Sequence, residues 1–242
     1  MRYLVISDIH ANFPALTAVL EDSAGKWDRI LCLGDIVGYG PFPNECIREL
    51  SRLPVRAVPG NHDWASIGRL DLNYFNEHAR AALAWTREQL DPDSREFLSR
   101  LKPVVMEDIF TLFHGALTGP ITHYILDSLD AEENFSLLRT PLGLFGHSHL
   151  RFFFSCGTDG RVVQHSLTER SNLDLLHRQN LLNPGSTGQP REGDPRAAYG
   201  LLDTEEGLWF FRRVEYDIPA VQQYMKESHL PDYLIRRLAE GR

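Results

Sequence analysis

The sequence predicts a layered α/β domain, and three patterns support that fold class. Residues 2–60 alternate apolar, strand-like runs with helical patterns, which is typical of parallel strands joined by crossover helices. Residues 74–100 continue with a helical periodicity, whereas short strand patterns and turns dominate from residue 142 onward. We therefore expect two mixed sheets that pack face to face, with helices on the outside.

The predicted helices of the N-terminal half begin at recognisable start signals. The first follows Asn12 and has Pro14 near its start, and the second follows Pro43. Within residues 74–100, apolar residues recur near the helical period until Asp91-Pro92 interrupts them. The first two of these helices would connect the strands that are predicted between residues 2 and 60.

The C-terminal half should consist mainly of strands. Residues 104–113 would hold one or two strands, and hairpins are predicted over residues 151–165 and 197–214. From about residue 216 the pattern predicts a helical tail of two short helices that is broken at Pro231.

Length and charge exclude several classes of protein. At 242 residues the chain is predicted to form one domain, residues 1–242. Its 25 Lys and Arg against 33 Asp and Glu give a net charge of −8, which does not suit a protein that binds long nucleic acid. No apolar run approaches the ~20 residues of a membrane span and no signal peptide is visible, so we expect a cytoplasmic protein with no membrane partner. Its three scattered cysteines do not predict a disulfide framework or a zinc knuckle.

Four segments place carboxylate, carboxamide or imidazole side chains directly after apolar runs that are predicted as strands. Side chains at the carboxyl ends of strands in an α/β domain converge on one crevice. Such a mixture of oxygen and nitrogen donors suits divalent transition metals. The segments are Asp8-Ile9-His10, Gly34-Asp35, Gly60-Asn61-His62-Asp63 and Gly146-His147-Ser148-His149.

The order of these motifs, with His114 after a further apolar run, resembles that of the calcineurin-like metallophosphoesterases. The resemblance extends to about residue 200 through Asn183-Pro184-Gly185-Ser186-Thr187-Gly188. In this region the chain is similar to the bacterial branch that contains small phosphoesterases and diadenosine-polyphosphate hydrolases. The resemblance implies a four-layer α-β-β-α sandwich of two mixed sheets flanked by helices.

The same resemblance implies two divalent metal ions, with Mn(II) expected and Fe, Zn, Co, Ni or Mg as alternatives. One Asp can link two cations because a carboxylate has two oxygens. The first metal would be held by Asp8, His10, Asp35 and His149, and the second by Asp35, Asn61, His114 and His147.

By the same resemblance, His62 faces the leaving group and is the catalytic residue. An imidazole with an ordinary pKa near ~6.5, or one raised by neighbouring carboxylates, can protonate the departing oxygen at neutral pH. Hydroxide generated between the two cations would attack phosphorus in line. Asp63 could orient His62, or it could cap the turn that follows.

Residues 183–196 form a second candidate element, which would set substrate specificity. Glycines and prolines predict a shaped loop here, and Arg191 is the candidate substrate-binding residue, with Arg196 close by. Both arginines could instead be surface residues that pair with Glu192 and Asp194.

We expect a phosphoester hydrolase whose partner is a small phosphorylated molecule: a phosphodiester, a nucleotide or a dinucleoside polyphosphate. A Ser/Thr protein phosphatase is the alternative, although those relatives carry an Asp-Arg pair and an Arg where this chain has Gly38-Tyr39 and Pro59. A non-catalytic scaffold is disfavoured, because one retromer subunit resembles the fold with a degraded site, whereas here every ligand position and His62 are present. The loop that carries Tyr39 could stack a base or cover the core, and the sequence does not determine the oligomeric state.

Overall fold

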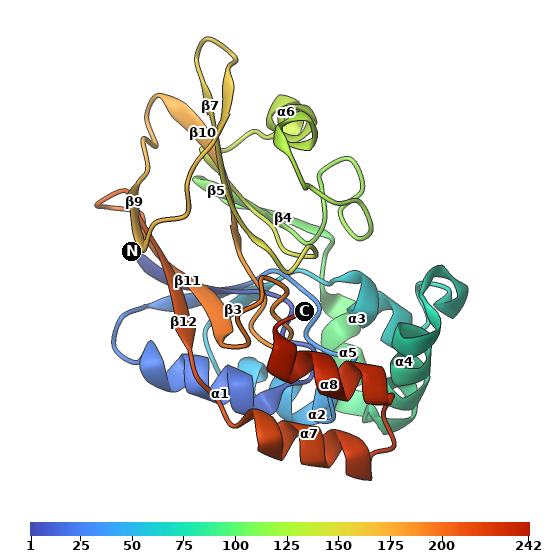
Figure 1. Ribbon diagram of the computed structural model, residues 1–242. Helices are drawn as coiled ribbons and strands as arrows, with labels where there is room; N and C mark the ends of the chain where they lie inside the picture. The colour runs from blue at the N-terminus through green and yellow to red at the C-terminus, as the bar shows by residue number, and fades with distance from the viewer.

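Two six-stranded sheets pack against each other in the computed structural model, which describes residues 1–242 (Figure 1). Each sheet combines parallel and antiparallel neighbours, which confirms the predicted pair of mixed sheets. Sheet A contains, from edge to edge, β3 (Val55–Ala57), β2 (Arg29–Cys32), β1 (Arg2–Ile6), β11 (Ala197–Asp203), β12 (Leu208–Val214) and β9 (Arg170–Asn172). Sheet B contains β4 (Val104–Met106), β5 (Phe110–Phe113), β6 (Leu142–Leu144), β10 (Arg178–Pro184), β7 (Arg151–Gly157) and β8 (Val162–Gln164).

The first three strands of sheet A are parallel, as predicted. β1 pairs with β2, and β2 pairs with β3, in parallel. On its other side β1 pairs antiparallel with β11, where Leu4 lies opposite Leu201. The strand that begins the fold is therefore central in its sheet, with neighbours from both halves of the chain.

Side chains between the two sheets form the inner core. Because successive residues of a strand point to opposite faces, Val5 and Leu31 of sheet A point inward and share a cluster with Leu112 and Leu144 of sheet B. Trp209 of β12 is fully buried in the same cluster. This core holds the carboxyl ends of β1, β2, β5 and β6 at fixed positions relative to one another.

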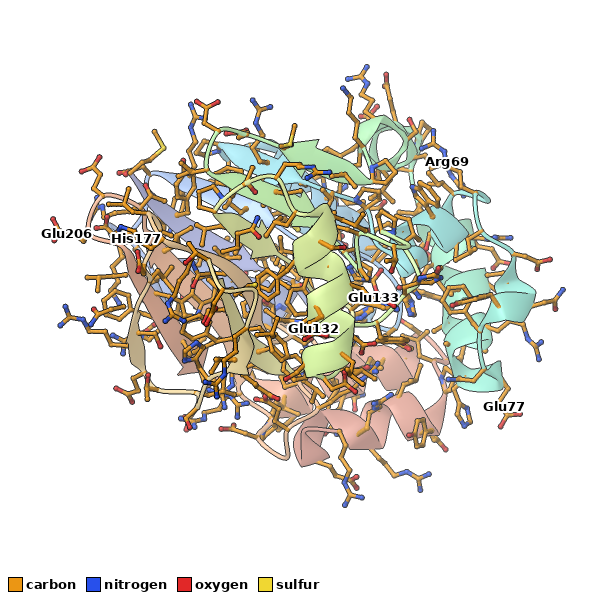
Figure 2. The ribbon with its side chains drawn as sticks, turned by 90° about the horizontal axis from the view of Figure 1, so that it is seen from above. Arg69, Glu77, Glu132, Glu133, His177 and Glu206 are labelled. Atoms are coloured by element: carbon orange, nitrogen blue, oxygen red, sulfur yellow. The ribbon has the colours of Figure 1, made fainter.

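Helices cover the outer face of each sheet and complete the predicted four layers (Figure 1). Leu4 and Ile6, which alternate with the inward-pointing residues of β1, pack against the helices on sheet A. Figure 2 shows the helix over sheet B, on which Glu132 and Glu133 are labelled. The covering helices are α1 (Phe13–Asp22), α2 (Pro43–Ser51) and α5 (Pro92–Arg100) on sheet A and α6 (Ser128–Leu137) on sheet B.

Side-chain caps explain where two of the predicted helices begin. The side-chain oxygen of Asn12 accepts a 3.2 Å hydrogen bond from the N–H of Ala15 and so caps α1. Asp91 caps α5 in the same way through the N–H of Ser94, at 2.7 Å. The helical pattern of residues 74–100 is therefore divided at this point, with η1 (Leu72–Tyr74) and α4 (Glu77–Gln89) before it and α5 after it.

A short helix, α3 (Asn61–Ser66), begins directly after Gly60. One segment differs from its predicted structure. Asn183 and Pro184 end strand β10 and do not open the expected loop. Both residues pair with β7, opposite Phe152 and Arg151, and the side-chain amide of Asn183 also donates a 2.8 Å hydrogen bond to the carbonyl oxygen of Gly146 in the loop after β6. The loop that follows therefore runs over residues 185–196.

The predicted helical tail is present as α7 (Ile218–Glu227) and α8 (Asp232–Glu240). Val221 of α7 and Leu234 of α8 share a buried cluster with Ala82 of α4 and Tyr39. This packing places the tail on the same side of the molecule as α1 and α2 (Figure 1). None of the helices combines the length and the apolar character that spanning a membrane requires.

Candidate metal centre

The loops after β1, β2, β5 and β6 bring the motif residues of both sheets together. Two groups of potential metal ligands result, and Asp35 belongs to both of them. Within each group the ligand atoms lie within 4.8 Å of one another, and every residue is buried. The groups are Asp8, His10, Asp35 and His149, and Asp35, His114 and His147.

The first group combines loops from sheet A with a loop from sheet B. The Nε2 of His10 lies 3.1 Å from the Nε2 of His149 and 3.7 Å from an Oδ2 of Asp35. The Nε2 of His149 lies 3.5 Å from the Oδ1 of Asp8. Two imidazoles and two carboxylates thus face one small volume, which is a donor set suited to a divalent transition metal.

The second group is centred on His114. Its Nε2 lies 3.4 Å from the Oδ2 of Asp35 and 3.1 Å from the Nδ1 of His147. The carboxamide oxygen of Asn61 is also 3.1 Å from this Nε2, so the structure brings Asn61 beside the group. The same oxygen of Asp35 faces His10 and His114, and it therefore lies between the two groups.

Each of these four histidines has its other ring nitrogen against a backbone carbonyl oxygen. When that nitrogen carries the ring proton and donates a hydrogen bond to the carbonyl oxygen, the nitrogen that faces the cluster keeps a free lone pair. A metal ligand requires such a lone pair. The pairs are His10 with Val37 at 3.3 Å, His114 with Leu33 at 2.7 Å, His147 with Thr122 at 3.3 Å and His149 with Gln189 at 2.6 Å.

Left-handed backbone conformations are concentrated in the same cluster. For a residue other than glycine this conformation costs about 1–2 kcal/mol, and such strain persists where surrounding contacts impose it, often at functional sites. Backbone hydrogen bonds between the loops supply part of that constraint here, as from the N–H of Asp8 to Gly34 at 3.0 Å. Five cluster residues have φ between 50° and 66°: Asp8, His10, Asp35, His147 and His149.

The environment of Asp8 fits a bound cation. Its Oδ2 accepts hydrogen bonds from the Ser7 hydroxyl at 2.6 Å and from the N–H of His147 at 3.2 Å. Its Oδ1 is buried and has no hydrogen-bond partner. Burial, reinforced by the charge of Asp35, raises the pKa of Asp8 to about 7. A cation beside Oδ1 would satisfy this oxygen and favour loss of the proton.

The protonation of the histidines also fits metal ligation. Burial holds the pKa of His10 and His149 well below the ordinary value and lowers that of His147 to about 3, so these imidazoles are neutral. Burial would lower the pKa of His114 too, but the carboxylate of Asp35 outweighs it and raises that pKa to about 9. A metal bound in the second group would displace this proton.

His62 lies against the first group without belonging to either group. Its ring centroid is 4.7 Å from that of His10, 4.3 Å from that of Tyr39 and 5.0 Å from that of Phe75. Burial among these rings lowers the pKa of His62 to about 4, although Asp35 opposes the shift. This differs from the expected ordinary or raised pKa. The Nδ1 of His62 is buried without a hydrogen-bond partner.

Asp63 acts as a cap and does not orient His62. One of its carboxylate oxygens accepts a 2.9 Å hydrogen bond from the N–H of Gly60, and the other accepts a 3.1 Å bond from the N–H of Val37. Asp63 therefore fixes the start of α3 to the loop after β2. That loop also supplies the carbonyl oxygen of Val37, against which His10 is held.

A pocket of about 330 Å³ opens onto the cluster. Asp35, His62 and His149 are among the residues that line it, and so is Arg191. Arg191 does not pair with either neighbouring acid, whereas Arg196 forms an ion pair with Asp194 at 2.7 Å. The structure thus separates the two arginines, one in the pocket and one paired on the surface.

Of the two roles that the sequence left open for Tyr39, the structure shows the one in the core. It is only 7% exposed and belongs to the core cluster with α4, α7 and α8. Its ring also lies 4.5 Å from that of His10, and it contributes to the pocket wall. Tyr39 is therefore a core residue with one edge at the site.

Three aromatic residues and one arginine of the pocket were not predicted. Tyr124 stacks on His147, with ring centroids 3.9 Å apart and an interplanar angle of 17°. No motif marked these residues, because Tyr74 and Phe75 look like the approach to a helix and Arg237 lies in the tail beyond all the motifs. The unpredicted residues are Tyr74, Phe75, Tyr124 and Arg237.

Comparisons with known proteins are consistent with this geometry. Residues 1–207 match the family model described as calcineurin-like phosphoesterase superfamily domain. A metallophosphoesterase from Sphaerobacter thermophilus of known crystal structure is 43% identical, with a TM-score of 0.89 that covers 100% of this chain and 99% of that one. The uncharacterized protein MJ0912 of Methanocaldococcus jannaschii is 36% identical over 98% of this chain and 97% of its own length. Phosphodiesterase YfcE of Escherichia coli K12 is 27% identical over 85% of this chain and 89% of its own.

Proposed function

This chain belongs to the calcineurin-like phosphoesterase superfamily and is a metallophosphoesterase, and from that premise we propose that it uses two metals to hydrolyse small phosphoesters. The substrates would be phosphodiesters, nucleotides or dinucleoside polyphosphates. One observation carries the proposal, namely that two groups of buried ligand-type side chains share Asp35. A carboxylate placed between two donor groups is the arrangement that a two-metal site requires.

The proposed ligands divide between the two groups as their positions suggest. Asp8, His10 and His149 would hold one metal, and Asn61, His114 and His147 the other, with Asp35 shared. We expect Mn(II), as the family resemblance implies, and a mixture of carboxylate, carboxamide and imidazole donors would also accept Fe, Zn, Co, Ni or Mg. When bound, the cations would neutralise phosphate charge and lower the pKa of a coordinated water.

The proposed role of His62 is to donate a proton to the departing oxygen. Its side chain is free of the ligand groups, and it lines the pocket through which a substrate would enter. The pKa of about 4 makes the imidazole neutral at pH 7 before substrate binds. An anionic phosphate beside the ring would favour the imidazolium and raise this pKa, so that His62 takes up a proton from solvent when the substrate binds.

The pocket favours small substrates over phosphoproteins. Tyr39 lies where protein phosphatases of this superfamily would present an arginine, and Pro59 replaces a second one. Guanidinium groups at these places would bind phosphate through two parallel hydrogen bonds, and this chain has none there. The aromatic rings of Tyr74 and Tyr124 line the pocket instead, and they suit a nucleobase or an aryl group.

A substrate panel with metal-loaded protein tests the proposal. After reconstitution with Mn(II), bis-p-nitrophenyl phosphate and dinucleoside polyphosphates should be cleaved with a higher kcat/KM than phosphoserine or phosphothreonine peptides. Asp35→Asn serves as the control for contaminating phosphatases, because it should abolish the activity. A more than tenfold preference for the peptides would replace the proposal with a protein phosphatase. Absence of turnover with Mn(II), Co(II), Ni(II), Fe(II) and Zn(II) would favour a non-catalytic scaffold.

A further inference from the structure

Two arginines from distant parts of the chain line the pocket above the candidate metal centre. Arg191 lies on the loop of residues 185–196, and Arg237 lies on α8. The family match ends at residue 207, so α8 adds a feature that the family model does not describe. Both side chains share the pocket with Asp35, His62 and His149.

Neither arginine is paired with an Asp or Glu side chain, although acidic residues are close by. Glu192 binds Arg151 at 2.8 Å and also pairs with Arg213, and Asp194 pairs with Arg196 and Arg213. The two acidic residues of the loop, Glu192 and Asp194, therefore already form ion pairs with other arginines. An arginine with no acidic partner at a pocket wall is available to an anion from solution.

The two arginine side chains are both partly buried. The Nε of Arg191 is buried without a hydrogen-bond partner. Burial and then the charge of Arg191 lower the pKa of Arg237 from its ordinary value. Two like charges that line one pocket repel each other, and an anion bound in that pocket would offset this repulsion.

Hydrogen bonds hold both arginines in place. Arg191 donates a 3.0 Å hydrogen bond to the Oε1 of Gln189, and the backbone carbonyl of Gln189 lies 2.6 Å from the Nδ1 of His149. Arg191 is thus connected to a proposed metal ligand through one residue. Because Gln189 and Arg191 lie on the same loop, residues 185–196, this loop sets the position of Arg191 relative to His149.

Contacts near the end of α8 hold Arg237. Its guanidinium carbon lies 5.4 Å from the ring centroid of Tyr233, and its Nε donates to a main-chain oxygen of Arg242. The N–H of Gly193 donates a 2.9 Å hydrogen bond to the carbonyl oxygen of Gly241. The end of α8 and the loop that carries Arg191 are therefore joined by backbone contact.

We propose that Arg191 and Arg237 form a subsite for a second phosphate group, which remains on the substrate next to the phosphate that is cleaved. This inference rests on the proposed function, because it assigns the metal cluster to the scissile phosphate. The pocket volume of about 330 Å³ is larger than one phosphate needs, and Tyr74 and Tyr124 line it as well. A nucleoside or dinucleoside polyphosphate matches this combination of cations, guanidinium groups and aromatic rings.

Kinetics on two substrates test the subsite. Arg191→Met and Arg237→Met should lower kcat/KM for diadenosine tetraphosphate by about 10- to 100-fold, as expected for loss of a charge-assisted hydrogen bond, and mainly through KM. The loss on bis-p-nitrophenyl phosphate, which has no second phosphate, should be at least fivefold smaller. Arg237→Lys keeps the positive charge but not the planar guanidinium group. Its kcat/KM for diadenosine tetraphosphate should therefore lie between those of Arg237→Met and the wild type.

Exposed arginines near the same segments supply matched controls. Arg236 precedes Arg237 on α8 and is exposed, and Arg196 is paired with Asp194 outside the pocket. Arg236→Met and Arg196→Met should leave both activities at the wild-type level. Equal losses on the two substrates in the Arg191 and Arg237 variants would overturn the subsite, and so would wild-type kinetics on both.

A binding measurement separates this inference from the proposed function. Methylenediphosphonate carries two phosphonates on a bridge that cannot be hydrolysed, and methylphosphonate carries one. In calorimetry with Mn(II)-loaded protein, the affinity ratio of the two ligands should fall at least tenfold in Arg191→Met and Arg237→Met but not in Arg236→Met. An unchanged ratio would sink the subsite even if the enzyme hydrolyses phosphoesters. A changed ratio in a protein that hydrolyses nothing would keep the subsite and reject the function.

Discussion

The backbone N–H of His62 donates a 2.8 Å hydrogen bond to the Oδ1 of Asp35. The other oxygen of Asp35 faces the imidazoles of His10 and His114. Asp35 and His62 are therefore joined through the backbone of His62, whereas their side chains have different proposed roles. Side-chain substitutions at these two positions should separate metal binding from proton transfer.

Asp35→Asn should lower the metal content per chain more than any other single ligand substitution does. The reason is that it removes a negative charge that both ligand groups share. The new carboxamide oxygen can still accept the hydrogen bond from His62, so the fold should persist. Metal per chain after Mn(II) loading, measured by elemental analysis, checks this expectation. Asp8→Asn is the comparison, since Asp8 belongs to one group alone. Equal metal loss in the two variants would argue against a shared ligand.

His62→Ala should leave the metal content nearly intact and lower activity by about 10²–10⁴-fold, the usual contribution of a positioned acid. The loss should depend on the leaving group, because a nitrophenolate departs without a proton and an alkoxide does not. Aryl esters should therefore lose least, and esters that release a nucleoside oxygen should lose most. If metal content falls together with activity, His62 supports the metal site. An equal loss for aryl and alkyl esters would assign His62 to phosphate binding.

Asp63→Ala should lower the free energy of unfolding by about 2–4 kcal/mol, because two buried N–H groups lose their acceptor. These groups belong to Gly60 and Val37. Asp63→Asn keeps one acceptor oxygen and should lose roughly half as much. Urea denaturation followed by circular dichroism measures both variants. A loss below ~0.5 kcal/mol for the alanine variant would mean that water or a rearranged loop satisfies these groups.

Asp194→Asn should destabilise the protein at neutral pH by about 1–3 kcal/mol, and the effect should disappear in acid. Hydrogen bonds from Arg196 and then Arg213 hold the pKa of Asp194 below its usual range. A carboxyl whose folded pKa is depressed contributes its full stabilisation above the unfolded pKa of ~3.9, and loses it as the pH falls further.

Urea denaturation at several pH values tests this expectation. The difference between wild type and Asp194→Asn should be constant from about pH 7 to pH 5 and should shrink below about pH 4. Glu206→Gln is the control, because Glu206 is exposed at the edge of the molecule (Figure 2). A difference that does not change with pH would assign the role of Asp194 to packing and neutral hydrogen bonds.

Local pattern predicted the two mixed sheets and the convergence of the motif residues, whereas the four layers and the division of the ligands were implied by the family resemblance. Asp8, Asp35 and His114 each come one to three residues after a buried strand, and parallel strands of one sheet end at the same edge. The left-handed conformation of these loops had no such signal. Residues like His10 adopt it only because contacts with the neighbouring loop impose it, as with the 2.9 Å hydrogen bond from its N–H to the carbonyl oxygen of Asp35.

Long-range packing accounts for the parts that were not predicted. Arg237 occupies an ordinary position in an amphipathic helix, and only the docking of α8 beside the loop of residues 185–196 brings it into the pocket. The lowered pKa of His62 depends on burial by Tyr39 and Phe75, which lie on other segments. Periodicity along one segment does not encode such contacts between segments.

The central place of β1 in sheet A has a consequence for synthesis on the ribosome. β2 emerges soon after β1, but its other neighbour, β11, is made only when residues 197–203 have been translated. For most of translation, one side of β1 is therefore an open strand edge with unpaired N–H and carbonyl groups, which can pair with other chains. The nascent chain should need a chaperone during this interval, and a ribosome that stalls before residue 197 should release an aggregation-prone product.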